Sequence, residues 1–117
     1  MPTNDIIDLP TFNDLKGLMG ADFVVELIDT YTQETADVIG QLGQALAAGD
    51  AAAFRRLAHS IKSSSASLGA LAFSQEAREL ELIGKSGDLT DAAARLEALA
   101  AAFLRVKQSL EALKNEP

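Results

Sequence analysis

The stretch LEALAAAFLRVKQSLEAL, residues 96–113, decides the fold class of this chain. Six of its large apolar residues are spaced alternately by three and four positions: Leu96, Leu99, Phe103, Val106, Leu110 and Leu113. This spacing places them on one side of a helix and is typical of left-handed packing in helical bundles. The stretch therefore predicts a long last helix, which begins near Thr90 and packs against other helices.

The rest of the chain also has helical periodicity, and no segment alternates with the period of two that a half-buried strand requires. The predicted helices run from about Phe12 to Leu18, Asp22 to Ala48, Ala51 to Leu68 and Ala70 to Lys85. Thr11 is the predicted cap of the first helix, and glycines mark the turns between the helices. The sequence thus predicts an all-α fold: an antiparallel, up-down four-helix bundle with a short additional N-terminal helix across one end.

Length and composition fit a single domain over residues 1–117, with 48% hydrophobic and 23% charged residues. The absence of cysteine excludes disulfides, thiolate metal clusters and a cysteine nucleophile. The sequence begins without a basic stretch followed by an apolar run, and charges interrupt every later apolar stretch. We therefore expect a cytoplasmic protein with no membrane segment, and a monomer.

The net charge of −7 makes nucleic acid an unfavourable partner, because phosphate binding would need a concentrated basic patch acting against an acidic surface. The same reasoning argues against acidic membrane surfaces, since no predicted helix has a face rich in lysine and arginine.

His59, the only histidine, lies in the third predicted helix. The apolar stripe of that helix consists of Phe54, Leu57, Ala58, Ile61, Ser65 and Leu68. His59 falls roughly 150° from the centre of this stripe, which predicts an exposed imidazole. The residues three and four positions away are Arg55, Arg56, Lys62 and Ser63. Three of them are cationic and would suit a dianionic group, while small neighbours such as Ser63 and Ala66 leave the imidazole free to approach another protein.

Periodicity alone leaves other interpretations of His59 open. A lone exposed histidine is usually an ordinary solvated side chain. One histidine with scattered carboxylates has no recognised ligand spacing, so no metal site is predicted. Several serines lie near His59, but nucleophilic catalysis by a triad also needs an orienting acid and an oxyanion hole.

The stretch AHSIKSSSASLGALAFSQEARELE, residues 58–81, resembles the core of histidine-containing phosphotransfer (HPt) domains, the phosphoryl carriers of multistep two-component relays. The family pattern is a histidine, a lysine three residues later, small residues, a leucine and glycine, and a glutamate or glutamine on the next helix. These places are occupied here by His59, Lys62, Ser63 to Ser65, Leu68, Gly69 and Glu81.

The resemblance implies a role for three side chains. His59 would be the phosphorylated nucleophile, Lys62 would pair with the phosphoryl oxygens, and Glu81 would accept a hydrogen bond from one ring nitrogen. Without the resemblance, an ion pair of Glu81 with Arg78 or Lys85 would be the simpler interpretation. Ser63 stands where the family typically has glycine, a departure that bears on how closely a partner backbone can approach.

The function implied by the resemblance is phosphoryl transfer. The protein would accept a phosphoryl group from a receiver-domain aspartyl phosphate and pass it to another response-regulator receiver domain, with a hybrid histidine kinase upstream. It would be a carrier, not an enzyme, because no glycine-rich loop is present to hold ATP. It would need no cofactor of its own, with Mg²⁺ expected only on the partner receiver domain.

Two alternatives belong to other classes. The first is a non-phosphorylated acidic helical adaptor that binds a partner through an exposed face, to which Leu71 and Leu82 would contribute. The second is a fragment of a histidine kinase. In such domains an acidic residue commonly follows the histidine, whereas Ser60 follows it here, and no kinase domain is attached.

Overall fold

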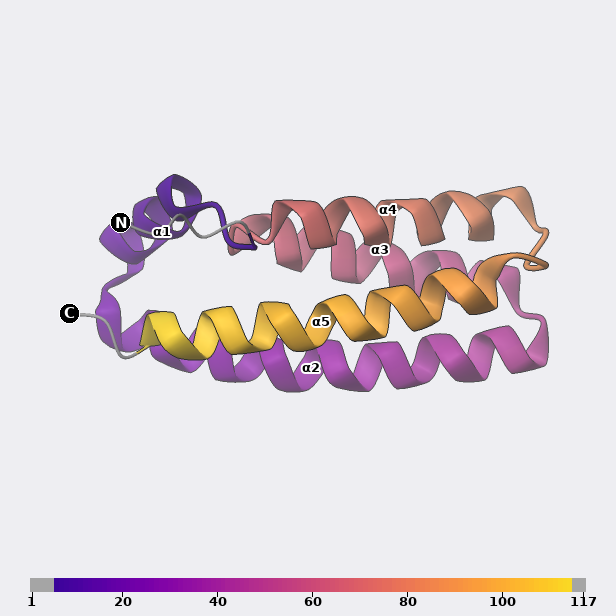
Figure 1. Cartoon of the computed structure of the whole chain (residues 1–117), viewed down its shortest axis with the longest axis horizontal. Helices are drawn as coiled ribbons and strands as arrows, with labels where there is room; N and C mark the ends of the chain where they lie inside the picture. Colours follow the sequence, from indigo (N-terminus) through magenta and orange to yellow (C-terminus); the bar gives the residue numbers. More distant parts are fainter. Residues whose placement is uncertain (1–5, 115–117) are drawn as a thin grey trace.

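The computed structural model describes residues 6–114, and within this range the chain forms five α-helices and no strand. The helices are α1 (Leu9–Met19), α2 (Ala21–Ala48), α3 (Ala51–Ser67), α4 (Leu71–Ser86) and α5 (Ala92–Lys114). Figure 1 shows α2 to α5 running antiparallel one after another, with the pair α3 and α4 lying over α2 and α5. Helix α1 lies at the end of the bundle, beside the turn between α3 and α4. The predicted all-α bundle with an additional N-terminal helix is confirmed.

The start of α1 differs from the prediction by three residues. The cap is Asp8 instead of Thr11: the Asp8 carboxylate accepts hydrogen bonds from the Thr11 amide at 3.2 Å and from the Thr11 hydroxyl at 2.5 Å. Pro10 lies inside the first turn, where its missing N–H would have had no partner in the helix. The prediction of Thr11 as the cap is wrong because the earlier carboxylate caps the helix first and takes Thr11 into its first turn.

The turn between α2 and α3 follows the predicted pattern. Gly49 has a φ of +68°, and its N–H reaches the carbonyls of Ala45 and Leu46 at the end of α2. Asp50 then caps α3 by accepting a hydrogen bond from the Ala53 amide at 3.0 Å. This short connection makes α3 reverse direction and pack beside α2.

The turn between α3 and α4 also anchors α1. The Asp8 N–H donates to the Gly69 carbonyl at 2.7 Å, and Gly69 has a φ of +91°. A Cβ atom at Gly69 would lie only 2.8 Å from the Asp8 carbonyl oxygen. Both the backbone conformation and the close approach therefore require glycine at this position.

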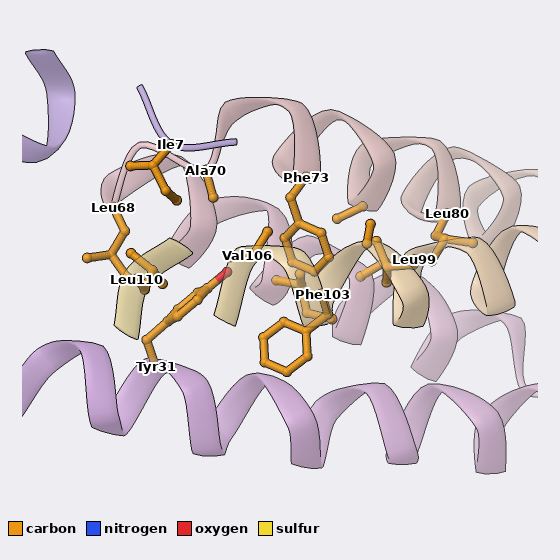
Figure 2. Close-up of a cluster of buried hydrophobic side chains, with 14 of the residues drawn as sticks. Ile7, Tyr31, Leu68, Ala70, Phe73, Leu80, Leu99, Phe103, Val106 and Leu110 are labelled. Carbon is orange, nitrogen blue, oxygen red and sulfur yellow. The ribbon is translucent and has the colours of Figure 1, made fainter. Parts of the chain in front are cut away.

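The core lies between the four long helices (Figure 2). The predicted apolar stripes all face it, and their largest fully buried members include Phe54, Ile61, Leu80, Leu99, Val106 and Leu110. Phe73 of α4 and Phe103 of α5 contact each other with ring centroids 5.9 Å apart. The buried hydroxyls of Tyr31 and Ser65 share a hydrogen bond of 2.6 Å between α2 and α3, and burial raises the pKa of Tyr31. This core fixes which sides of α3 and α4 remain outside.

Candidate functional site

His59 lies on the outer side of α3, and its side chain is 59% exposed. Ala58 and Ile61, its neighbours on the core stripe, are 0% and 1% exposed. The prediction that the imidazole points away from the core is therefore confirmed.

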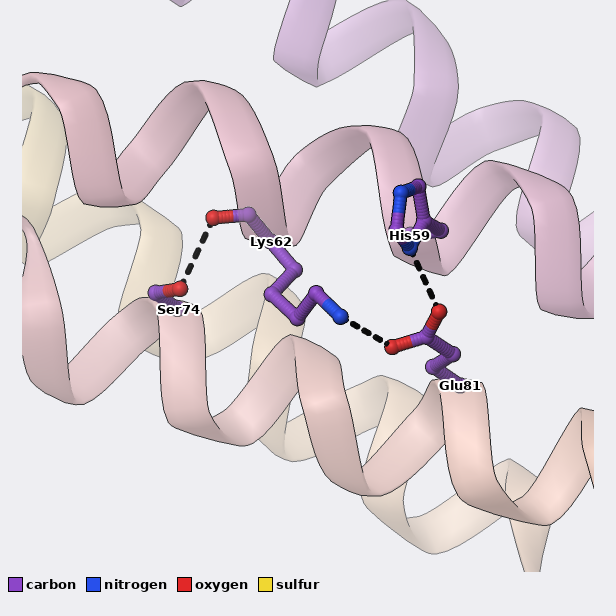
Figure 3. Close-up of polar contacts among 4 residues, drawn as sticks. All are labelled: His59, Lys62, Ser74 and Glu81. Atoms are coloured by element: carbon purple, nitrogen blue, oxygen red, sulfur yellow. Dashed lines mark hydrogen bonds and ion pairs between the residues drawn. The ribbon is translucent and has the colours of Figure 1, made fainter.

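Glu81 of α4 brings a carboxylate to this histidine. Its Oε2 atom lies 2.5 Å from Nδ1 of His59. Figure 3 shows the two side chains pointing toward each other from α3 and α4. Its side chain is only 15% exposed, because it lies between the two helices. The alternative ion pair of Glu81 with Arg78 or Lys85 is wrong, since the carboxylate instead contacts two side chains of α3.

Lys62, one turn after His59 on α3, makes the second contact with the Glu81 carboxylate. Its Nζ atom donates to Oε1 of Glu81 at 2.6 Å, so the two oxygens of one carboxylate hold two different side chains of α3. The Lys62 side chain is 30% exposed, at the edge of the core. In this structure Lys62 thus reaches the site through Glu81, an arrangement that the sequence pattern did not predict.

The ionisation of Glu81 determines which ring nitrogen carries hydrogen. The hydrogen bond from Lys62, helped by the one from His59, holds the pKa of Glu81 below its ordinary value in spite of burial. The carboxylate is therefore ionised at neutral pH and can only accept. Nδ1 of His59 must then be the donor, which leaves the lone pair of the neutral ring on Nε2. Figure 3 shows this second nitrogen pointing away from Glu81.

An open hollow of about 340 Å³ adjoins the imidazole. It is lined by Ala52, Arg55, Arg56, His59 and Glu81. The structure therefore brings both predicted arginines next to the histidine. Ser63 and Ala66 do not line it: Ser63 is exposed one turn further along α3, and Ala66 is half-buried. Within residues 6–114 the Ser63 hydroxyl makes no hydrogen bond.

Two residues of α4 that sequence reasoning missed fix how α4 lies against α3. Ser74 is 8% exposed and donates to the backbone carbonyl of Lys62 at 2.8 Å. Gly84 is buried, and a Cβ atom there would lie 2.7 Å from the backbone nitrogen of Arg55. The spacing of Ser74 and Gly84 could have indicated this role. Together with Ala77 and Glu81 they form a row of mostly small residues on one side of α4, which allows a close approach of another helix.

Residues 6–114 contain no group of three or more histidine, cysteine or acidic side chains placed to hold a metal ion. None of the five described helices combines the length and apolar character needed to span a membrane.

The structure thus presents one exposed imidazole on a four-helix bundle, oriented by a carboxylate of the neighbouring helix, which is the arrangement that the resemblance to histidine phosphotransfer domains implied. A family model described as the Hpt domain matches residues 26–116, and the chain belongs to this family. It is also similar to the crystal structure of histidine-containing phosphotransfer protein B (HptB) from Pseudomonas aeruginosa PAO1. The two are 29% identical over 96% of each chain, with a TM-score of 0.89. A comparison with curated proteins found no match. The chain is thus a histidine phosphotransfer protein of a phosphorelay.

Proposed function

We propose that His59 is the residue that carries the phosphoryl group, accepting it from the aspartyl phosphate of one receiver domain and passing it to the aspartate of another. The observation that carries the proposal is the hydrogen bond between Nδ1 of His59 and Glu81, which leaves the lone pair of the neutral ring on Nε2, the nitrogen that points away from Glu81. His59 is also the only histidine of the sequence.

The transfer step follows from this tautomer. Nε2 attacks the phosphorus atom, a P–N bond forms, and the P–O bond to the aspartyl oxygen breaks, so the aspartate leaves as a carboxylate. Nδ1 keeps its proton throughout, and the phosphorylated ring carries a positive charge that Glu81 balances. Transfer to the second receiver domain is the same step in reverse.

The cations near His59 would offset charge on the phosphoryl oxygens. Lys62 has three N–H donors, so its amine can stay near Glu81 and also donate to the phosphoryl group. Arg55 and Arg56 border the hollow beside the imidazole and add positive charge in a protein that is otherwise acidic. Such preorganised donors lower the barrier to phosphoryl transfer, which depends mainly on positioning and charge.

The partners in this proposal are response-regulator receiver domains, with a hybrid histidine kinase as the source of phosphate. Mg²⁺ is expected on the receiver domain, and the chain itself is expected to need no cofactor and to have no kinase activity. The cytoplasmic location expected from the sequence is part of the same proposal.

A labelling experiment tests the proposal. The purified protein is mixed with a receiver domain carrying radioactive aspartyl phosphate, and the label is followed on a gel. We expect base-stable, acid-labile phosphate on the chain, none on the His59→Gln variant, and none when ATP replaces the receiver domain. Label on His59→Gln would contradict the proposal. Unlabelled wild-type protein whose partner binding survives His59→Gln would support an adaptor instead.

A further inference from the structure

Gly84 of α4 lies where the backbones of α3 and α4 approach each other closely. It is buried, and a Cβ atom at this position would lie 2.7 Å from the backbone nitrogen of Arg55 and 2.8 Å from its Cα and Cβ atoms. Ordinary contacts of such an atom begin at 3.4 Å. Two of the three obstructing atoms belong to the backbone, so no rotation of the Arg55 side chain can make room.

This close approach is one helical turn from the hydrogen bond between His59 and Glu81. Gly84 follows Glu81 by three residues on α4, and Arg55 precedes His59 by four residues on α3. Because α3 and α4 are antiparallel, Gly84 and Arg55 both lie on the same side of the contact between His59 and Glu81, toward one end of the helix pair. Figure 3 shows the Ser74 hydrogen bond to the Lys62 carbonyl on the other side of Glu81. The two helices are therefore fixed together on both sides of the carboxylate.

We propose that Gly84 is a positioning residue: its missing side chain sets the separation of α3 and α4 at which the Glu81 carboxylate reaches Nδ1 of His59. The consequence for phosphoryl transfer rests on the proposed function, whereas the consequence for the histidine tautomer does not. A methyl group at position 84 forces α4 away from α3 by most of an ångström. The hydrogen bond of 2.5 Å that Nδ1 of His59 donates to the Glu81 carboxylate weakens strongly when the two atoms separate by that much.

The test measures the tautomer of His59 directly, by ¹⁵N NMR of the imidazole in alkaline solution without any phosphoryl donor. The wild type is expected to hold its ring proton on Nδ1. Gly84→Ala is expected to shift the proton toward Nε2, the nitrogen that an unconstrained histidine favours, to about the extent found in Glu81→Ala. Gly40→Ala is the matched control, because Gly40 is also a helical glycine but has open space around it. It should keep the wild-type spectrum.

Transfer from a phosphorylated receiver domain is measured separately on the same proteins. Gly84→Ala should be about tenfold slower than the wild type, since a misplaced nucleophile loses the advantage of orientation, and Gly40→Ala should be unchanged. If the wild type takes no label, the proposed function fails while the tautomer comparison still stands. A folded Gly84→Ala with the wild-type tautomer would overturn the inference about Gly84.

If Gly84→Ala does not fold, it can be tested in a protein stabilised by Gly40→Ala and Gly43→Ala. If it does not fold there either, a second variant, Glu81→Asp, tests the proposal. Glu81→Asp withdraws the carboxylate by one methylene and leaves the contact between Gly84 and Arg55 untouched. If helix separation sets the reach of the carboxylate, Glu81→Asp loses the Nδ1 tautomer. If it retains that tautomer, the hydrogen bond does not depend on the separation, and the proposal is wrong.

Discussion

At the scale of single residues, one carboxylate organises the site. Glu81 is mostly shielded from solvent, accepts from both His59 and Lys62, and remains ionised because those donors lower its pKa. A neutral acceptor would orient the ring less firmly and would not balance the charge of a phosphorylated imidazole. The orientation of the His59 ring therefore depends on a residue 22 positions later in the sequence.

The pKa of Glu81 leads to a prediction about pH. Because the folded-state pKa lies below the ordinary value of 4.5, the interaction stabilises the fold fully above pH 4.5. Its contribution is lost as the pH falls through the lower, folded-state value. The difference in unfolding free energy between the wild type and Glu81→Gln, measured with urea, should shrink as the pH falls below 4.5. A difference that keeps its size or grows as the pH falls below 4.5 would contradict the ion pairs.

Lys62 gives a second prediction at this scale. Lys62→Ala should slow transfer about tenfold or more, because a donor to the phosphoryl oxygens is lost. A partly exposed ion pair contributes little to stability, so the unfolding free energy should change by less than about 1 kcal/mol. Lys107→Ala is the control, since Lys107 is exposed on α5, a helix that does not line the hollow beside His59. Unfolding of Lys62→Ala, or an unchanged rate of transfer, would count against the assigned role.

At the scale of helices, local signals predicted most of the structure. Asp50 and Gly49 marked the boundary between α2 and α3 correctly because their effect depends only on neighbouring residues. The start of α1 was misplaced because Asp8 and Thr11 can both cap a helix, and the prediction chose Thr11 although aspartate is the stronger cap. Gly84 was not foreseen, because its importance comes from the backbone of another helix.

Gly69 provides the prediction for this scale. Gly69→Ala combines a φ of +91° with a Cβ contact of 2.8 Å to the Asp8 carbonyl, and should destabilise the protein by about 1–3 kcal/mol. Gly40→Ala should instead stabilise it by about 0.5–1 kcal/mol, since a helix interior favours alanine. Urea denaturation of both variants checks the pair. Equal effects would show that the turn between α3 and α4 does not require glycine.

At the scale of the whole molecule, the apolar stripes predicted the bundle and the exposure of His59 together. A helix with one side in the core must present its opposite side to solvent, so both results follow from the same periodicity. The contact between His59 and Glu81 could not be predicted in this way. Without the resemblance, Glu81 was expected to pair with Arg78 or Lys85, and only the resemblance to the family connected it to the histidine.

The last helix leads to a prediction about assembly. Its alternating apolar residues could in principle pair with a second chain, but Leu99, Phe103 and Val106 are buried in the chain's own core. We therefore expect a monomer. Sedimentation equilibrium should give the mass of one chain at all concentrations, and a dimer that persists on dilution would contradict this expectation.

The central claim is that Nε2 of His59 carries the phosphoryl group while Nδ1 keeps its proton toward Glu81. NMR of the ¹⁵N-labelled protein, phosphorylated by a receiver domain, tests both parts at once. The account predicts a ³¹P–¹⁵N coupling to Nε2 and a proton on Nδ1 of the same ring. A phosphoryl group on Nδ1, or on any other residue, would contradict it.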